Sequence, residues 1–528
     1  MQQTVIHIPA EVRQILSALT EAEFSAHLVG GCVRDLLCGI VPKDWDVATS
    51  AAPEDIQRIF PDSFYENDFG TVGVKTGARE PALAVVEVTP YRVETTYSDK
   101  RHPDKVTFTD SLERDLARRD FTINAMAISL NSKHEAQNSK QIQNPKIPNS
   151  KRLEFRNSNL DIVSDFGFRI SDFNIVDPFG GREDLQKGII RAVGKAEERF
   201  GEDALRLMRA ARFAAELGFA IEAKTKTAIK KHAGLLEMVA RERVRDEFLR
   251  MLESAHPDTG LELLRELGLL RFVAPELEEG VGVSQNLHHI YTVWEHNIRA
   301  MQYAAEQKWP IAVRMASLLH DVGKPRAKRG KGRDSTFYGH EVVGAKMTAQ
   351  ILSRLRFSKE FTERITKLVR FHLFYYNVDE VTESSVRRLI REVGPEDMDA
   401  LIQVRMADRI GSGVPKAEPY KLRHFRFMVE KLQRDPISVG MLKIDGNDIM
   451  QTTGLAPGPK VGQLLNILLD EVLDDPKRNT KAKLTARTKE LAPLSEAELA
   501  KLARAAKHKA LGLEEEAVAQ IKKKHYVK

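Results

Sequence analysis

The chain has 528 residues, a length that predicts about two to four domains because a single hydrophobic core does not grow that large. Lysine and arginine number 81 against 75 aspartates and glutamates, so the formal net charge is +6 and a nucleic-acid partner is permitted without being required. The start lacks a basic region followed by an apolar core, and no run of about eighteen apolar residues occurs. We therefore expect a cytoplasmic protein with no membrane partner.

The first predicted elements lead to a pair of acids. Residues 10–26 carry apolar side chains at helical spacing, which predicts a helix before the first strand. Residues 28–49 then indicate a strand, a Gly-Gly turn, a short helix and a second strand that carries Asp44 and Asp46. Side chains two apart on a strand project from the same face, so these two carboxylates are expected to converge.

Asp44 and Asp46 are candidate metal ligands, because two converging carboxylates repel each other unless a cation lies between them. Mg²⁺ fits, since it takes a few protein oxygens and completes its shell with water and substrate phosphates. Gly30 and Gly31 would let the backbone approach a triphosphate, and Arg34 adds a positive fork for the same phosphates. Each fragment alone is more often an ordinary turn or strand end, but in this order they predict phosphoryl or nucleotidyl transfer.

The segments VGGCVRDLLCG and KDWDVAT resemble the signature of the bacterial-type (class II) tRNA nucleotidyltransferase and poly(A) polymerase family, which includes the CCA-adding enzymes. The resemblance implies an α+β fold, with a mixed-sheet nucleotidyltransferase head followed by an all-helical neck, an HD domain and a helical body and tail. It also implies that Asp44 and Asp46 are catalytic and hold Mg²⁺.

A second block, residues 112–127, resembles the ribose-recognising motif of the same family. Either of its aspartates can accept hydrogen bonds from sugar hydroxyls, and either of two adjacent arginines can neutralise phosphate. The alternative is a solvated, amphipathic helix start. The candidate nucleotide-binding residues of this block are Asp115, Arg118, Arg119, Asp120 and Asn124.

Residues 131–175 depart from the family pattern. Asn-Ser-Lys occurs at 131, 138 and 149, and Ser-Asp-Phe recurs at 164 and 171. This composition predicts a low-complexity insertion between two strands, too polar to join the core. We expect that replacing residues 133–173 by a short turn leaves activity intact.

Residues 202–219 are predicted to form one helix. Asp203 and Arg206 would share a face, with Arg209 and Arg212 continuing the row. An acceptor beside a donor fork matches the edge of cytosine or adenine, whereas guanine and uracil present the opposite order. The resemblance implies the same choice of CTP and ATP without a nucleic-acid template. The alternative is an ordinary surface ion pair.

A second metal constellation follows, and its order resembles that of an HD domain, a helical, metal-dependent phosphohydrolase fold. Its predicted ligands are His296, His320, Asp321, His340, His372 and Asp408. Imidazole and carboxylate together suit Mn, Ni, Co, Fe or Zn. Whether such a domain hydrolyses a substrate or serves as a scaffold stays open at this point.

The chain is thus expected to fall into five parts. They are a head at 1–176 with the insertion at 131–175, a helical neck with the base-selecting helix at 177–284, an HD domain at 285–412, a helical RNA-binding body and tail at 413–494, and a basic tail at 495–528. Residues 501–528 hold eight lysines and arginines against three glutamates. This tail would add salt-sensitive RNA affinity or simply remain solvated.

Together these features predict template-independent addition of CCA to the 3′ end of tRNA from CTP and ATP, with an accessory HD phosphohydrolase domain. A CC-adding enzyme, an A-adding enzyme and a poly(A) polymerase share the same motifs and remain rivals. An HD phosphohydrolase that only binds nucleotides in its head is a rival of another class. A non-catalytic RNA-binding protein is disfavoured, because both acids and the whole arginine row are present. The oligomeric state is left open.

Overall fold

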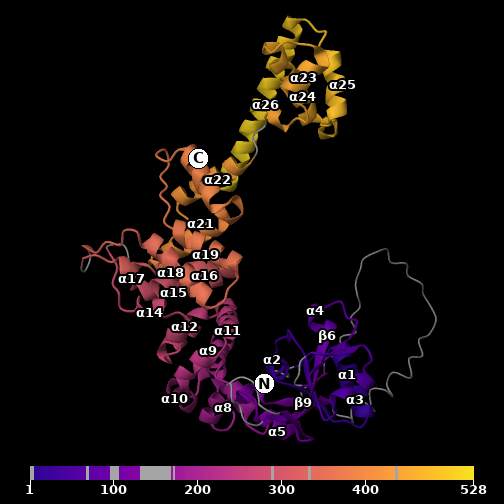
Figure 1. The fold of residues 1–528 in the computed structure, drawn as a ribbon, viewed down its shortest axis with the longest axis vertical. Coiled ribbons are helices and arrows are strands. Elements are labelled where there is room, and N and C mark those ends of the chain that lie inside the picture. Colours follow the sequence, from indigo (N-terminus) through magenta and orange to yellow (C-terminus); the bar gives the residue numbers. More distant parts are fainter. Residues whose placement is uncertain are drawn as a thin grey trace, which may run out of the picture. The chain divides into compact units, whose positions relative to one another are not determined.

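The computed structural model describes residues 5–66, 70–94, 106–130, 168–169, 173–286, 290–330, 334–434 and 438–527. The chain forms two compact units, Met1–Glu363 and Arg364–Lys528. The first unit holds a sheet and many helices, whereas the described part of the second is helical (Figure 1). The predicted class, a mixed-sheet head followed by helices, is confirmed. No helix in the described ranges is both long and apolar enough to cross a membrane.

A seven-stranded mixed sheet forms the head, with strand order β11-β9-β2-β3-β6-β5-β4. Among its neighbours only β3 and β6 run parallel. Its strands are β2 (Ala26–Val29), β3 (Asp46–Thr49), β4 (Ser63–Tyr65), β5 (Val72–Lys75), β6 (Val85–Pro90), β9 (Ala127–Leu130) and β11 (Phe173–Val176). The short strand pairs are β1 (Val5–Ile6) with β10 (Phe168–Arg169), β7 (Arg92–Glu94) with β8 (Val106–Phe108), and β12 (Ile189–Ile190) with β13 (Ala220–Ile221).

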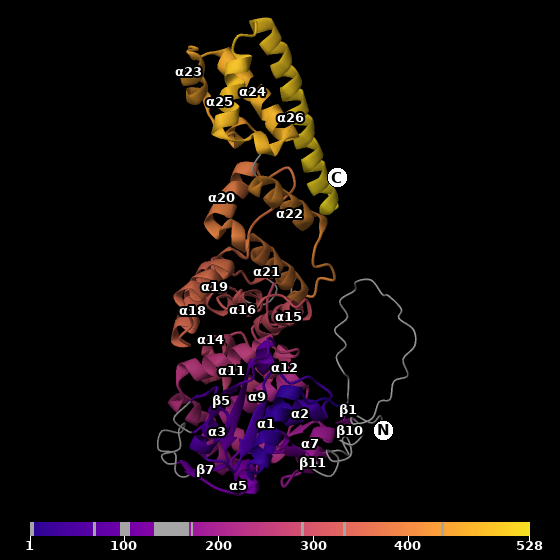
Figure 2. The ribbon, with the colours of Figure 1, turned by 90° about the vertical axis from the view of Figure 1, so that its right-hand side faces the viewer.

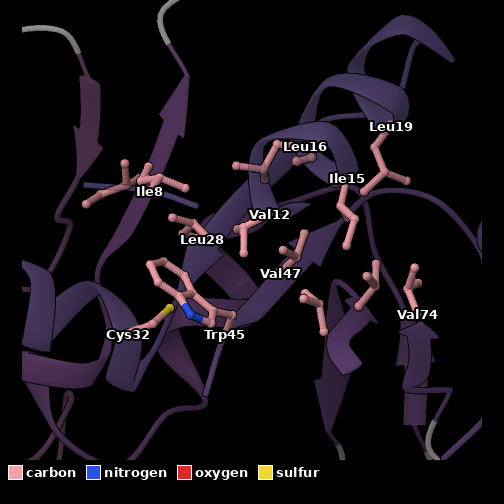
Figure 3. Close-up of a cluster of buried hydrophobic side chains, with 14 of the residues drawn as sticks. Ile8, Val12, Ile15, Leu16, Leu19, Leu28, Cys32, Trp45, Val47 and Val74 are labelled. Atoms are coloured by element: carbon pink, nitrogen blue, oxygen red, sulfur yellow. The ribbon is translucent and has the colours of Figure 1, made fainter. Parts of the chain in front are cut away.

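The predicted lead-in helix is α1 (Ala10–Glu21), and its apolar face is buried in the head core. Figure 3 shows Val12 and Leu16 of this helix near Leu28 and Trp45. Trp45 is only 3% exposed. Because side chains alternate along an extended chain, burying Trp45 in the core turns the acids on either side of it away from the core.

The prediction that both acids lie on a strand is wrong for Asp44. Strand β3 begins at Asp46, and Asp44 lies in a bend before it. Strand β2 pairs with β3 only as far as Leu28 opposite Val47, because the chain turns away at Gly30. Asp44 therefore has no partner strand on that side.

The head and neck contain further helical segments, several of which position the site described below. They are α2 (Gly31–Leu37), α3 (Pro53–Ile59), α4 (Pro81–Ala84), α5 (Leu112–Ala117), η1 (Thr122–Asn124), α7 (Gly181–Lys187), α8 (Ala196–Glu202), α9 (Arg206–Leu217), α10 (Ala223–His232), η3 (Ala233–Met238), α11 (Arg241–Glu253), α12 (Pro257–Glu266), α13 (Leu270–Val273) and α14 (Pro275–Glu278). Then follow α15 (Val293–Glu306), α16 (Ile311–Leu319), α17 (Lys324–Ala327), α18 (His340–Arg354) and α19 (Lys359–Phe371), the last of which contains the boundary between the two units.

The second unit continues with α20 (Glu383–Val393), η5 (Pro395–Asp397), α21 (Met398–Gly411), α22 (Tyr420–Gln433), η6 (Val439–Met441), α23 (Gly446–Thr453), α24 (Pro459–Asp474), η7 (Pro476–Arg478), α25 (Lys481–Leu491) and α26 (Glu496–Lys524). Leucines of α24, α25 and α26 form one buried cluster, and α26 is the long yellow helix of Figure 2.

The basic tail is helical, as predicted, but its end is not simply solvated. Lys524 Nζ lies 2.8 Å from Glu430 of α22, and His525 Nε2 lies 2.6 Å from the same carboxylate. His525 is 9% exposed. The expectation of a solvated tail is therefore wrong for this last turn.

The predicted insertion is shorter than the sequence suggested. Residues 131–167 and 170–172 lie outside the described residues, but β11 begins at Phe173 and pairs antiparallel with β9. Phe173 is 8% exposed and belongs to the head core. The predicted deletion of 133–173 would therefore remove a core side chain.

We predict that replacing residues 131–172 by Asn-Gly preserves the fold. Leu130 and Phe173 are directly opposite each other, so a two-residue turn can close the β9–β11 hairpin. We expect a melting temperature within about 4 °C of the parent, the shift that about 1 kcal/mol produces in a large domain. The matched deletion that also removes Phe173 should melt several degrees lower, because it opens a cavity. Precipitation or inactivity of the shorter deletion would contradict this prediction.

Candidate active site

One cavity of about 980 Å³ in the first unit collects the predicted site residues. It lies where the head meets α9 and α11, and it is lined by both acids, both glycines and the whole arginine row. The predicted residues that line it are Gly30, Gly31, Arg34, Asp44, Asp46, Arg118, Arg119, Asp120, Asn124, Asp203, Arg206, Arg209 and Arg212. Of the predicted catalytic and nucleotide-binding residues, Asp115 alone is not part of this lining.

The Gly-Gly turn brings backbone, an acid and a guanidinium close together. Gly30 has φ +78°, a conformation that side chains disfavour. A Cβ there would lie 2.7 Å from Arg119 Nη1 and 3.3 Å from Asp46 Oδ2. Glycine is therefore required at this position both for the turn and for the close approach. Arg34, one turn into α2, donates from Nη1 to Asn124 Oδ1 at 2.9 Å.

Asp46 of β3 and Glu87 of β6 lie close to other carboxylates. Burial raises the pKa of Asp46 to about 6, and Asp44 and Glu66 add to this while Arg119 opposes it. Partial burial and the carboxylates of Asp46, Glu66 and Asp44 raise the pKa of Glu87 to about 7. Carboxylates that repel one another in their charged forms are suited to binding a shared cation.

Glu87 is a third carboxylate that the sequence analysis missed. It lies on β6, directly opposite Asp46 of β3 in the parallel register. The available signal was the pattern Val85-Val-Glu-Val, in which a single acid interrupts an apolar strand. Only the pairing of β3 with β6 places that acid beside Asp46.

The second block places its two aspartates in different surroundings. Asp115 is 1% exposed and lies 2.8 Å from Arg118 Nη2 and 3.4 Å from Arg119 Nη2. Although burial opposes it, these two arginines lower the pKa of Asp115. Asp115 therefore holds the two arginines from behind, and the hypothesis that it accepts from a sugar hydroxyl has no support in this geometry. Its alternative, Asp120, does line the cavity.

Asp120 is the buried anchor of the cavity. Its Oδ1 accepts hydrogen bonds from the Phe121 backbone at 2.8 Å and from Asn124 Nδ2 at 3.1 Å. Its Oδ2 lies 2.6 Å from Arg209 Nη2. Although burial opposes it, Arg209 holds the pKa of Asp120 well below its usual range. This carboxylate is therefore charged across the ordinary pH range.

The predicted continuous helix through residues 202–219 is wrong. Helix α8 ends at Glu202, Asp203 is extended with φ −128° and ψ 106°, and α9 begins at Arg206. The Asp203 side chain accepts from Leu205 N at 3.0 Å, a local hydrogen bond that competes with the helix. Asp203 and Arg206 nevertheless both line the cavity.

Each arginine of the row is paired with an acid from a different segment. Arg206 Nη1 lies 2.7 Å from Glu202, and Arg212 Nε lies 3.2 Å from Glu247 of α11. Phe213 lies beneath them, with the Arg212 guanidinium 4.2 Å and the Arg34 and Arg209 guanidiniums 5.2 Å from its ring centre. Neither Glu247 nor Phe213 was singled out from the sequence.

Helix α11 also contacts the predicted base-reading acid. Arg243 Nη2 lies 3.0 Å from Asp203 Oδ2, and Arg243 Nη1 lies 3.3 Å from Oδ1. The sequence analysis placed this helix in the neck and singled out none of its residues. The structure places Arg243 in the cavity lining.

The histidine cluster of the first unit is buried and centred on Asp321. Asp321 Oδ2 lies 3.0 Å from His296 Nε2 and 3.3 Å from His320 Nε2, and its Oδ1 lies 3.2 Å from His340 Nε2. Lys324 Nζ lies 2.5 Å from Asp321 Oδ2. Ligand atoms of His296, His320 and Asp321 lie close enough together to hold a divalent metal, and His340 contacts the same Asp321 carboxylate.

The tautomers of these histidines suit metal binding. His320 Nδ1 lies 2.8 Å from Ser317 O, and His340 Nδ1 lies 2.7 Å from Phe337 O. A carbonyl can only accept, so each Nδ1 carries the proton and each Nε2 presents a lone pair. This lone pair points to the side where Asp321 lies.

The other two predicted ligands belong to the second unit. His372 is 1% exposed, and its Nδ1 lies 2.7 Å from Val369 O. Asp408, 8% exposed, lies 2.6 Å from Arg405 Nη1. Their assignment as metal ligands stays a prediction.

Three family models match the chain. They are the Poly A polymerase head domain over residues 26–139, the probable RNA and SrmB-binding site of polymerase A over 218–280, and the HD domain over 293–411. The predicted HD domain thus matches a known model almost over its predicted range.

Known relatives align over most of the chain. The A-adding tRNA nucleotidyltransferase of Deinococcus radiodurans is 32% identical and covers 84% of this chain and 91% of its own. The CCA-adding enzyme of Latilactobacillus sakei is 30% identical and covers 89% of this chain and 95% of its own. The crystal structure of the Bacillus stearothermophilus CCA-adding enzyme in complex with CTP is 27% identical, covers 92% of this chain and 98% of its own, and has a TM-score of 0.55.

Similarity at this level over nearly the full length of two relatives, together with a matching poly(A) polymerase head, shows that the chain belongs to the bacterial-type tRNA nucleotidyltransferase and poly(A) polymerase family.

Proposed function

We propose that this protein adds CCA to the 3′ end of tRNA from CTP and ATP without a nucleic-acid template. The observation that carries the proposal is the single cavity that joins a carboxylate cluster, a Gly-Gly turn and an acceptor and donor for a base edge. The similarity to a CCA-adding enzyme over most of the chain supports it.

Asp44 and Asp46, with Glu87 beside them, are the proposed ligands of Mg²⁺. The donor set fits, because carboxylate oxygens are what this hard cation prefers, and burial together with neighbouring carboxylates raises the pKa values of Asp46 and Glu87 although Arg119 partly offsets the rise at Asp46. Bound there, Mg²⁺ would supply the Lewis acidity that nucleotidyl transfer needs at the 3′-hydroxyl and the α-phosphate. The residues themselves fix where that charge is placed.

The cationic side of the cavity is proposed to bind the triphosphate. Gly30 and Gly31 expose backbone beside Asp46, and Arg34 and Arg119 face the same space. Arg119 contacts Asp115 behind it, so its guanidinium is held in place before the nucleotide arrives. Positioning, rather than covalent chemistry, is what these residues contribute.

Asp203 and Arg206 are proposed to read the base. Asp203 can accept from the amino group of cytosine or adenine, and Arg206 can donate to the neighbouring ring acceptor. Uracil and guanine would meet an acceptor with an acceptor. The choice of nucleotide therefore rests on protein side chains, and the helical neck and tail are the proposed contacts for tRNA.

The first-unit histidine cluster supports a second activity, hydrolysis of a phosphate ester in the HD domain. The proposed ligands of a transition metal such as Mn, Ni, Co, Fe or Zn are His296, His320, Asp321 and His340. Water bound to this metal would supply the nucleophile for hydrolysis. The HD match runs to residue 411, so it includes the two ligands predicted in the second unit.

Nucleotide addition is tested with tRNA transcripts that end before CCA, after C and after CC, each given CTP, ATP or both. We expect all three to be completed to CCA and no further. Asp44→Ala should lower the rate by more than about 1,000-fold, because it removes a proposed metal ligand. The matched control is Asp62→Asn, an exposed head carboxylate that lies 3.4 Å from Lys75 and is not part of the cavity lining, which should retain the rate. Addition of A alone, of C alone or of long A tracts would replace the proposal by the corresponding rival.

The raised pKa values predict how Mg²⁺ binding depends on pH. Between their ordinary values of 3.8 and 4.5 and the shifted values of about 6 and about 7, Asp46 and Glu87 hold protons in the folded state that the unfolded chain has released. Without metal their contribution to stability is therefore fully present at low pH and is lost as pH rises through those values. Mg²⁺ must displace these protons, so its stabilising effect should grow over the same range.

We expect Mg²⁺ to raise the melting temperature clearly at pH 8 and hardly at pH 5.5, as measured by differential scanning fluorimetry. Glu87→Gln should weaken the effect at pH 8. Glu87→Gln should also shift the onset of the Mg²⁺ effect to lower pH, because the variant lacks one carboxylate that repels the other acids. A pH-independent Mg²⁺ effect would contradict the assignment of these acids as its ligands.

Asp321→Asn separates the two proposed sites. The change keeps the shape of the side chain but removes the charge at the centre of the histidine cluster. We expect loss of bound transition metal by elemental analysis and loss of phosphodiester hydrolysis, with CTP incorporation retained. A wild-type protein that holds no metal after incubation with Mn²⁺, Ni²⁺ or Co²⁺ would argue against the HD activity.

A further inference from the structure

Arg243 is the residue whose position points beyond the proposed function. It lies in the first turn of α11 and makes two parallel contacts with Asp203, at 3.0 Å and 3.3 Å. Both side chains are largely shielded, with 25% of Arg243 and 17% of Asp203 exposed. A planar fork on a carboxylate fixes the orientation of the carboxylate as well as its distance.

Asp203 needs such a contact because its own backbone does not fix it. It lies in the extended break between α8 and α9, where no helical neighbour restricts its rotation. Oδ1 accepts a hydrogen bond from Leu205 N at 3.0 Å, whereas Oδ2 accepts one from Arg243 Nη2 at 3.0 Å. Of about four acceptor positions on a carboxylate, these three hydrogen bonds leave one for a ligand.

Arg206 is prepared in a comparable way. Its Nη1 donates to Glu202 at 2.7 Å and to Arg199 O at 3.1 Å, and its Nη2 donates to Arg118 O at 2.8 Å. A guanidinium has five N–H groups, so two remain for a base edge. An acceptor and a donor are therefore each held by protein contacts and each left partly open toward the same cavity.

We propose that Arg243 is a positioning residue for base selection: it fixes the Asp203 carboxylate so that one oxygen faces the amino group of cytosine or adenine and repels the carbonyl of uracil or guanine. This inference rests on the proposed function. Arg243 does not touch the base; it acts through Asp203. Without it the carboxylate can rotate away from the carbonyl of a wrong base, so rejection weakens more than binding of the correct base.

Arg243 is also separable from the support of the neck. Helix α11 is anchored by Val244, Phe248, Met251 and Leu252, all of which are buried. Arg243 is on a different face and contacts the cavity. Its replacement by glutamine should therefore leave α11 folded, which a melting curve can verify.

The experiment compares kcat/KM for CTP and for UTP on a tRNA transcript that ends before CCA. Because each value is measured on the same preparation, their ratio is unaffected by the fraction of folded enzyme. We expect Arg243→Gln to lower the CTP to UTP ratio by about tenfold or more, the effect of losing a charge-assisted, bidentate contact. Arg243→Lys, which keeps the charge but not the fork, should recover part of the ratio.

The control is Arg245→Gln on the same helix. Arg245 contacts Asp246 and the backbone oxygen of Arg356 and is not part of the cavity lining, so the ratio should not change. Asp203→Asn combined with Arg243→Gln should give the same ratio as Asp203→Asn alone, because Arg243 acts only through Asp203. An unchanged ratio in Arg243→Gln, or additive losses in the double variant, would overturn the inference.

Equilibrium binding of CTP and UTP keeps the two proposals distinguishable. If the wild-type protein binds CTP in preference to UTP but extends no tRNA, the proposed function fails, whereas Arg243→Gln still tests the inference by its effect on the binding ratio. If the enzyme extends tRNA and Arg243→Gln leaves both ratios unchanged, the inference alone fails.

Discussion

The structure of the cavity depends on how like charges are kept apart. Arg206, Arg209 and Arg212 follow one another along a single helix face, and in a partly buried site they would repel by several kcal/mol. Arg209 lies 2.6 Å from the buried Asp120, Arg212 lies 3.2 Å from the buried Glu247, and Arg206 lies 2.7 Å from the partly exposed Glu202, so each positive charge has a carboxylate close by. Helix α9 on its own could not present this row, because the partners come from the head and from α11.

Phe213 adds a second restraint on the same charges. The guanidiniums of Arg34, Arg209 and Arg212 lie between 4.2 Å and 5.2 Å from its ring centre. The face of an aromatic ring attracts cations without neutralising them. The head and the neck therefore share one apolar contact that gathers positive charge in the cavity, while the carboxylates of Asp44 and Asp46 face the same space.

The sequence was informative where function depends on local spacing. The Gly-Gly turn predicted a close approach of the backbone to a triphosphate, which stays a prediction, and the structure shows that Gly30 leaves room only for a hydrogen next to Asp46 and Arg119. The sequence was not informative where the role of a residue depends on partners that are distant along the chain. Asp115 and Asp120 look alike in the sequence, but only pairing with Arg118 and Arg119 reveals that Asp115 lies behind the cavity. Likewise, Glu87 becomes part of the site only through the register of two parallel strands.

The histidines, in contrast, are oriented by a contact with the nearby backbone. His320, His340 and His372 each place Nδ1 against the carbonyl oxygen of the residue three positions earlier, at 2.7 Å to 2.8 Å. This contact lies within one short segment, so it needs no partner from elsewhere in the fold. This contact fixes the tautomer in which Nε2 is free of hydrogen and can bind a metal, independently of the other ligands. The local backbone geometry thus prepares these histidines for a metal, whereas the proposed base selection by Asp203 and Arg206 in the neck requires contacts from several distant segments.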